Sequence, residues 1–205
     1  YAAYGPLVHA MHMFLAGNEL SDLEKDFKDY LPILERLKQE RSYVAMRLFQ
    51  QVVLNLRGLS DDPCVLAGEA YREQEYLPVH EKGKDLVTLF DVYFCKMLLC
   101  YLFERYDEAL QNSISAEKYL QAQAGQAYFT FYHFYASLVL LAYVEGKAAA
   151  ERRRLLKKVA HNQKAMKKWA KYAPMNFTHK VLLIEAELHR LQGKNERAAA
   201  CYEGA

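Results

Sequence analysis

The chain has 205 residues, of which 52% are hydrophobic and 25% are charged, a balance typical of a globular protein with a substantial core. A formal net charge of +2 excludes a bulk electrostatic attraction to nucleic acid or to membranes. The charge is uneven, because ten Lys and Arg residues and one acidic residue, Glu151, lie between Lys147 and Lys171. This segment therefore carries +9 and the remainder carries −7.

Cysteine use and hydropathy predict a cytoplasmic chain. The four cysteines form no Cys-x-x-Cys pair, which is typical of small buried side chains in a reducing compartment. No signal peptide is present, and no uncharged run of about 18 residues is long enough to span a bilayer. The chain starts without Met and stops inside a helical pattern, so we expect a segment of a longer polypeptide.

In the first part of the chain, apolar residues recur at spacings of three and four, which is typical of amphipathic helices. The sequence predicts helices over residues 6–16, 19–37 and 41–56, and a short helix that ends before Pro78. Pro32 predicts a kink or break in the second of these helices, since proline removes an internal hydrogen bond. Residues 64–81 are the least regular part.

Further helices are predicted over residues 84–103, 106–121, 127–144, a basic segment that ends at Tyr172, residues 176–191, and from Asn195 onward. The stretches 101–110 and 188–202 both predict tight corners between antiparallel helices, with Gly193 as the turn in the second. Such pairs cannot bury their apolar faces alone, so neighbouring pairs must stack. The predicted fold is therefore all-α, an α-solenoid of about ten helices. We expect a single domain over 1–205, with possible sub-blocks 1–80 and 81–205.

The predicted helix over residues 127–144 is the most aromatic. Tyr128, Tyr132 and Tyr135 fall on one stripe, and their phenol groups would suit a groove for a peptide or small molecule. The alternative is that these side chains are core, because packed helix pairs also place aromatics at helical spacing.

The basic segment predicts a second candidate surface. Its exposed cations gather opposite an apolar stripe, and they are Arg153, Arg154, Lys157, Lys164, Lys168 and Lys171. Such a face would suit an acidic partner, an anionic lipid surface or nucleic acid, although a solvated outer face is the simpler alternative. No aromatic is interleaved among the charges for base stacking, so we expect no nucleic-acid partner.

Catalytic and metal-binding patterns are weak. His9 and His12 lie three residues apart, but no further ligand follows at matching spacing, and a zinc site needs three or four. Phosphate-binding glycine loops, nucleophile elbows and His-Glu-x-x-His motifs are missing from the sequence. We therefore expect no catalytic residues, no metal and no cofactor, and an independent helical enzyme is the weakest alternative.

Several stretches resemble the helical region of very large bacterial signalling multi-kinases, which carry a Ser/Thr kinase domain, a STAND-type ATPase, a GAF domain and a sensor histidine kinase. The resemblance rests on residues 48–56, 75–78, 96–103, 117–120, 129–132 and 169–180. The most specific stretch is Trp169-Ala-Lys-Tyr-Ala-Pro-Met-Asn-Phe-Thr-His-Lys180. The catalytic residues of such kinases lie in other domains, so none is carried over.

The chain is also similar to degenerate tetratricopeptide repeats. Ala186, Gly193, Ala198, Tyr202 and Ala205 match the repeat's small, turn, alanine and aromatic positions. A first copy keeps Ala109 and Ala116 but has Met97 where a small residue belongs and Ser113 where an aromatic belongs. This departure predicts helix packing that is looser than in the regular repeat.

These resemblances imply a non-catalytic regulatory or scaffold segment that binds a protein or a neighbouring domain of the same chain. The alternative function is a small-molecule sensor, with a pocket between the aromatic helix over residues 127–144 and the helix around Phe90 to Phe103. The partner, the ligand and the oligomeric state are open at this point.

Overall fold

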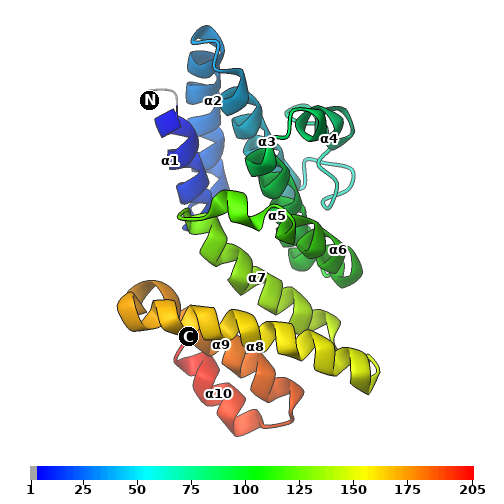
Figure 1. The fold of residues 1–205 in the computed structure, drawn as a ribbon. Helices are drawn as coiled ribbons and strands as arrows, with labels where there is room; N and C mark the ends of the chain where they lie inside the picture. Colours follow the sequence, from blue (N-terminus) through cyan, green and yellow to red (C-terminus); the bar gives the residue numbers. More distant parts are fainter. Residues whose placement is uncertain (1–3) are drawn as a thin grey trace. The chain divides into compact units, whose positions relative to one another are not determined.

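The computed structural model describes residues 4–205, and its regular elements are all helices (Figure 1). The described residues form ten α-helices and one short 3-10 helix, and no strand. The all-α class and the expected number of helices are confirmed. The chain divides into two compact units, of which the first ends at Phe103 and the second begins at Glu104. A continuous solenoid through both units stays a prediction.

The first unit contains α1 (Tyr4–Leu15), α2 (Leu20–Arg36), α3 (Glu40–Leu56), α4 (Glu73–Lys82) and α5 (Leu86–Leu102). Helices α1, α2 and α3 pack against one another, and α5 packs against both α3 and α4. None of the helices within residues 4–205 has the length and apolar character that crossing a bilayer requires.

Two helices continue past a proline, so a break at Pro32 and a helix end before Pro78 are both wrong. Helix α2 continues through Pro32, and α4 continues through Pro78 to Lys82. Both prolines are exposed, so water can hydrogen-bond to the carbonyls that they leave without a helical N–H partner. Two residues after each proline the helix buries a side chain, Leu34 in α2 and His80 in α4.

Two buried amides of α3 hold the irregular segment over residues 57–72. Gln51 Oε1 accepts from the backbone N–H groups of Ala70 and Tyr71 at 3.1 and 3.2 Å. Asn55 Nδ2 donates to the carbonyls of Pro63 and Val65 at 3.1 and 2.8 Å. These two side chains therefore satisfy four backbone groups of the loop, and backbone bonds such as Gly68 N–H to the Tyr71 carbonyl satisfy others.

The second unit contains α6 (Tyr106–Glu117), η1 (Leu120–Gln123), α7 (Ala127–Tyr143), α8 (Ala149–Tyr172), α9 (Pro174–Leu191) and α10 (Asn195–Glu203). Helix α7 packs against α6, η1, α8 and α9, while α9 also packs against α8 and α10. The predicted helix over residues 106–121 is too long, because α6 ends at Glu117 and the chain turns into η1. No Gly or Pro marks this end; Leu120 and Gln123 are instead buried in η1, which packs on α7.

Four helix corners share one backbone geometry. Lys38, Lys84, Glu104 and Gly193 have φ values of 51°, 51°, 60° and 69°. The residue after each has φ between −78° and −93° and ψ between 65° and 76°. Both predicted corners, at residues 101–110 and 188–202, are among these four and are confirmed as turns. The left-handed residue lets the chain satisfy carbonyls at the helix end before the next helix begins.

We expect replacement of a corner lysine by glycine to stabilise the fold. Lys38 is exposed and left-handed, a conformation that costs a residue with a Cβ more than it costs glycine. Lys38→Gly should raise the free energy of unfolding by up to about 1 kcal/mol in urea titrations followed by circular dichroism. The matched change Lys28→Gly, in the middle of α2, should lower it by about 1 kcal/mol. Equal losses in both variants would contradict the assigned corner geometry.

Candidate functional site

Two consecutive amides on α8 fix this helix between α7 and α9. Asn162 and Gln163 are both buried. Asn162 Nδ2 donates to Ser137 Oγ of α7 at 3.2 Å, and Gln163 Nε2 donates to the Val181 carbonyl of α9 at 2.8 Å. Because buried amides are costly to leave unpaired, these two bonds set both the rotation and the register of α8.

The orientation of the Asn162 side-chain amide also determines which ring nitrogen of the half-buried His133 carries the proton. Since its Nδ2 faces Ser137, Asn162 Oδ1 faces His133 Nδ1 at 3.0 Å, so that ring nitrogen is the donor. Ser137 Oγ in turn donates to the His133 carbonyl at 2.7 Å. Burial lowers the pKa of His133 below its ordinary value, and this outweighs the hydrogen bond to Asn162, which raises it.

A pocket of about 760 Å³ lies within the second unit, between α6, η1, α7 and α8. Its volume falls in the range of about 300 to 1,000 Å³ that is usual for small-molecule sites. Phe129, His133 and Trp169 line it and are in mutual ring contact, with centroids 5.1 to 6.2 Å apart. Sequence reasoning missed this pocket, because its walls come from four elements.

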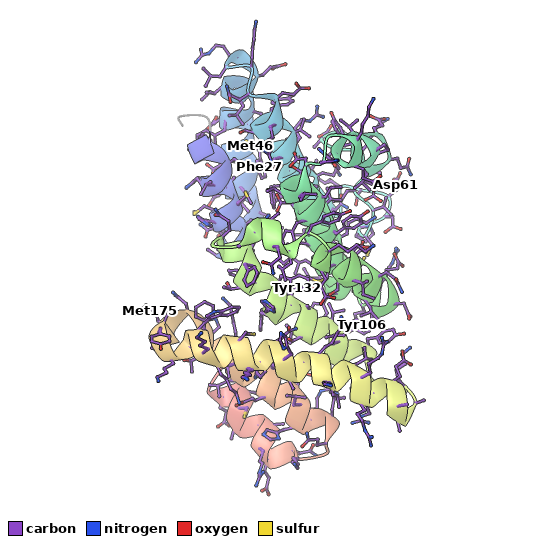
Figure 2. All side chains as sticks on the ribbon, viewed as in Figure 1. Phe27, Met46, Asp61, Tyr106, Tyr132 and Met175 are labelled. Carbon is purple, nitrogen blue, oxygen red and sulfur yellow. The ribbon has the colours of Figure 1, made fainter. Side chains whose placement is uncertain are left out.

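Of the three predicted groove tyrosines, Tyr132 alone lines the pocket. Figure 2 labels it on α7. Its side chain is buried, and its hydroxyl donates to the Ser113 carbonyl at 3.1 Å. Burial raises the pKa of this phenol. Tyr128 is buried and Tyr135 is half-buried, and neither lines the pocket. Of the three hydroxyl-bearing side chains, only that of Tyr132 therefore contributes to this pocket.

The predicted basic residues form one continuous face of α8, which we call the α8 basic face. All six are exposed, and they are Arg153, Arg154, Lys157, Lys164, Lys168 and Lys171. At about 100° per residue they span about 100° of arc, and Arg154 and Lys157 at its N-terminal end also line the pocket. Within residues 4–205, none of the six takes part in an ion pair.

The turn from α8 to α9 exposes two large apolar side chains. Tyr172 is 76% exposed and Met175 is 84% exposed, more than any other large apolar residue among those described. Figure 2 labels Met175 at this turn, which we call the α8–α9 corner. Lys171 precedes it, with Nζ 5.9 Å from the centre of the Tyr172 ring. The sequence marked this stretch only through its resemblance to the multi-kinases.

A second, more open pocket of about 410 Å³ lies in the first unit, beside α3, α4 and the start of α5. Arg41 and Asp85 line it and form an ion pair at 2.6 Å. His80 stacks on Tyr76 with centroids 6.2 Å apart, and burial lowers the pKa of His80. The described residues contain no group of three or more His, Cys, Asp or Glu side chains that would hold a metal ion, and His9 lies instead 3.4 Å from Asp26.

The sequence matches no protein-family model, no curated protein and no solved structure. The function must therefore be argued from the surfaces and the pocket.

The lowered pKa of His133 predicts a stability loss in acid. An unfolded histidine, with an ordinary value of 6.5, binds protons that the folded state resists, so the contribution of His133 is complete above pH 6.5. It should be lost progressively as the pH falls below 6.5. We expect the His133 ring to titrate below pH 6.5 in NMR spectra assigned with His133→Gln.

His80 and His179 also have lowered pKa values, so they contribute to the loss of stability in acid as well. The variant His133→Gln separates the contribution of His133 from theirs. His133→Gln should reduce the pH dependence of the unfolding free energy between pH 5 and about 6.5 without abolishing it. A His133 midpoint at or above 6.5 would contradict the buried, neutral donor assigned here.

Proposed function

We propose that this chain is a non-catalytic helical-repeat segment with a regulatory or scaffold role, which binds a protein or a neighbouring domain of a bacterial signal-transduction multi-kinase. The observation that carries this proposal is a single exposed surface, made of the α8 basic face and the α8–α9 corner. It combines charges that form no ion pair within residues 4–205 with large exposed apolar side chains.

The α8 basic face is built like a linear recognition surface. From Arg153 to Lys171 it extends about 27 Å at 1.5 Å per residue. Five of its six cations, Arg153, Lys157, Lys164, Lys168 and Lys171, fall within about 60° of arc. Since like charges in a row repel one another, the arrangement favours an acidic surface or helix of a partner laid along α8.

The α8–α9 corner supplies the apolar contact that a cationic stripe lacks. Tyr and Met are enriched at the centres of protein interfaces, and Met adapts to irregular pockets because it is unbranched. Tyr172 and Met175 expose these groups beside Lys168 and Lys171. The partner that fits is an acidic protein surface with a small apolar cavity at one end.

The resemblance to the multi-kinases supports the same surface. Its most specific stretch, residues 169–180, spans the end of α8, the α8–α9 corner and the first turns of α9. A segment beside a nucleotide-driven ATPase would regulate it by binding one of its states better than another. The proposed role is therefore a docking arm, and the chemistry belongs to other domains of the parent protein.

Charge reversal on α8 tests this proposal. Binding of the purified ATPase domain that the resemblance places beside this segment is measured by calorimetry at low and at physiological salt. We expect Lys164→Glu with Lys168→Glu to weaken binding at least tenfold, and salt to weaken binding of the unchanged chain, since exposed charges are screened. Met175→Ser should weaken binding without altering its salt dependence.

The control reverses two exposed lysines of the same unit that lie outside α8. Lys118→Glu with Lys194→Glu makes the same change in net charge and should alter affinity less than twofold. Equal losses of affinity in both double variants would show that binding depends on the net charge and not on the α8 basic face. Absence of binding by the unchanged chain, or binding that salt and the α8 substitutions leave unchanged, would overturn the proposal.

A further inference from the structure

The pocket in the second unit is an elongated site with two different ends. One wall is a stripe of α8 at spacings of four, three, four and four residues, formed by Arg154, Lys158, His161, Ala165 and Trp169. At 1.5 Å per residue this wall is about 22 Å long. It begins with cations and ends with an indole, so charge falls and apolar character rises along it.

The charged end has an excess of cations. Arg154, Lys157 and Lys158 line the pocket there, and the one acidic residue in the lining is Glu117 of α6. Glu117 already forms an ion pair with Lys158, with Nζ and Oε2 2.8 Å apart. Arg154 and Lys157 have no ion-pair partner in the part of the chain that the structure describes. An anionic group at this end would therefore find two cations without displacing an existing pair.

The opposite end is apolar and aromatic. Phe129 and Trp169 meet edge to face, with ring centroids 6.2 Å apart. Ile114 of α6, one helical turn before Glu117, also lines the pocket and is 42% exposed. Apolar carbon left open to water in a concave site gains free energy when an apolar ligand covers it.

We infer that this pocket binds an elongated organic anion, with its carboxylate at Arg154 and Lys157 and its alkyl body extended toward Phe129 and Trp169. The ligand class that fits is a medium- to long-chain carboxylate. The two ends of the site match the two ends of such a molecule in charge, in polarity and in order along α8.

This inference does not depend on the proposed partner. Arg154 and Lys157 belong both to the α8 basic face and to the pocket lining, but Lys164, Lys168, Lys171 and Met175 do not line the pocket. Failure of one proposal is therefore distinguishable from failure of the other.

Trp169 provides a built-in probe, because it is the only tryptophan of the chain and it lines the pocket. Dansyl-labelled undecanoate bound in the pocket should accept excitation energy from Trp169 and quench its emission. Unlabelled decanoate should displace this probe at least tenfold better than decanol, which has the same chain length and no charge. Equal displacement by the acid and the alcohol would overturn the assignment of an anion site.

Variants then locate the site. Arg154→Gln with Lys157→Gln should weaken decanoate binding about tenfold, as expected for two exposed charge contacts. The control, Arg153→Gln with Lys164→Gln, removes the same charge from the same helix outside the pocket and should leave binding within twofold. Similar losses in both double variants would overturn the assigned position of the carboxylate.

Two further variants act on the pocket in opposite directions. Ala165→Phe fills the middle of the α8 wall and should abolish energy transfer to the probe, while circular dichroism reports that the helices remain. Glu117→Gln releases Lys158 from its ion pair and should tighten decanoate binding several-fold, a gain that misfolding would not produce. Unchanged affinity in both variants would place the ligand elsewhere and overturn the inference.

Discussion

The seating of α8 by Asn162 and Gln163 is the constraint on which both candidate sites depend. One amide bonds to α7 and the next bonds to α9, so the two neighbouring residues hold the helix from two sides. Such bonds tolerate little rotation or sliding, because a shift would leave the buried amide N–H donors of both residues unpaired. A more apolar seam would bury α8 as well but would define its register less sharply.

This seating divides α8 into three stripes with different roles. A buried stripe includes Leu155, Val159 and Met166 and secures the packing. A second stripe faces the pocket and ends at Trp169, and a third carries the exposed cations toward Lys171. The two functional stripes meet near the N-terminal end of α8, where Arg154 and Lys157 belong to both. A ligand in the pocket and a protein at the corner would influence each other only if one changed the binding free energy of the other.

The sequence predicted what depends on local spacing and missed what depends on tertiary packing. Apolar periodicity marked the helices, and glycines such as Gly193 marked turns, because both signals lie within a few residues. Helices α2 and α4 continue through Pro32 and Pro78 because both prolines are exposed to water, and the local sequence pattern does not show this exposure. The left-handed backbone of Lys38, Lys84 and Glu104 had no compositional signal, since the residues there are not glycine.

The candidate residues followed the same division. The cations of the α8 basic face were predicted as exposed from the opposition of charged and apolar stripes, a property of one helix. The tyrosines were grouped by helical spacing, but only Tyr132 lines the pocket, because α6, η1 and α8 determine which part of α7 borders it. His133 of α7 contacts Asn162 and Trp169 of α8, so no motif within one stretch of sequence predicts this group.

The chain after α6 also borders the pocket beside α7. It turns after Glu117, and Leu120 and Gln121 of η1 line the pocket. Leu120 is buried in η1, which packs on α7. Helices α6 and α8 both pack on α7, and the Lys158–Glu117 ion pair joins them across the pocket. A surface ion pair of this kind contributes on the order of 1 kcal/mol or less, so it can yield to a competing carboxylate at little cost. The Glu117 carboxylate is therefore an anion that a ligand carboxylate can replace beside Lys158.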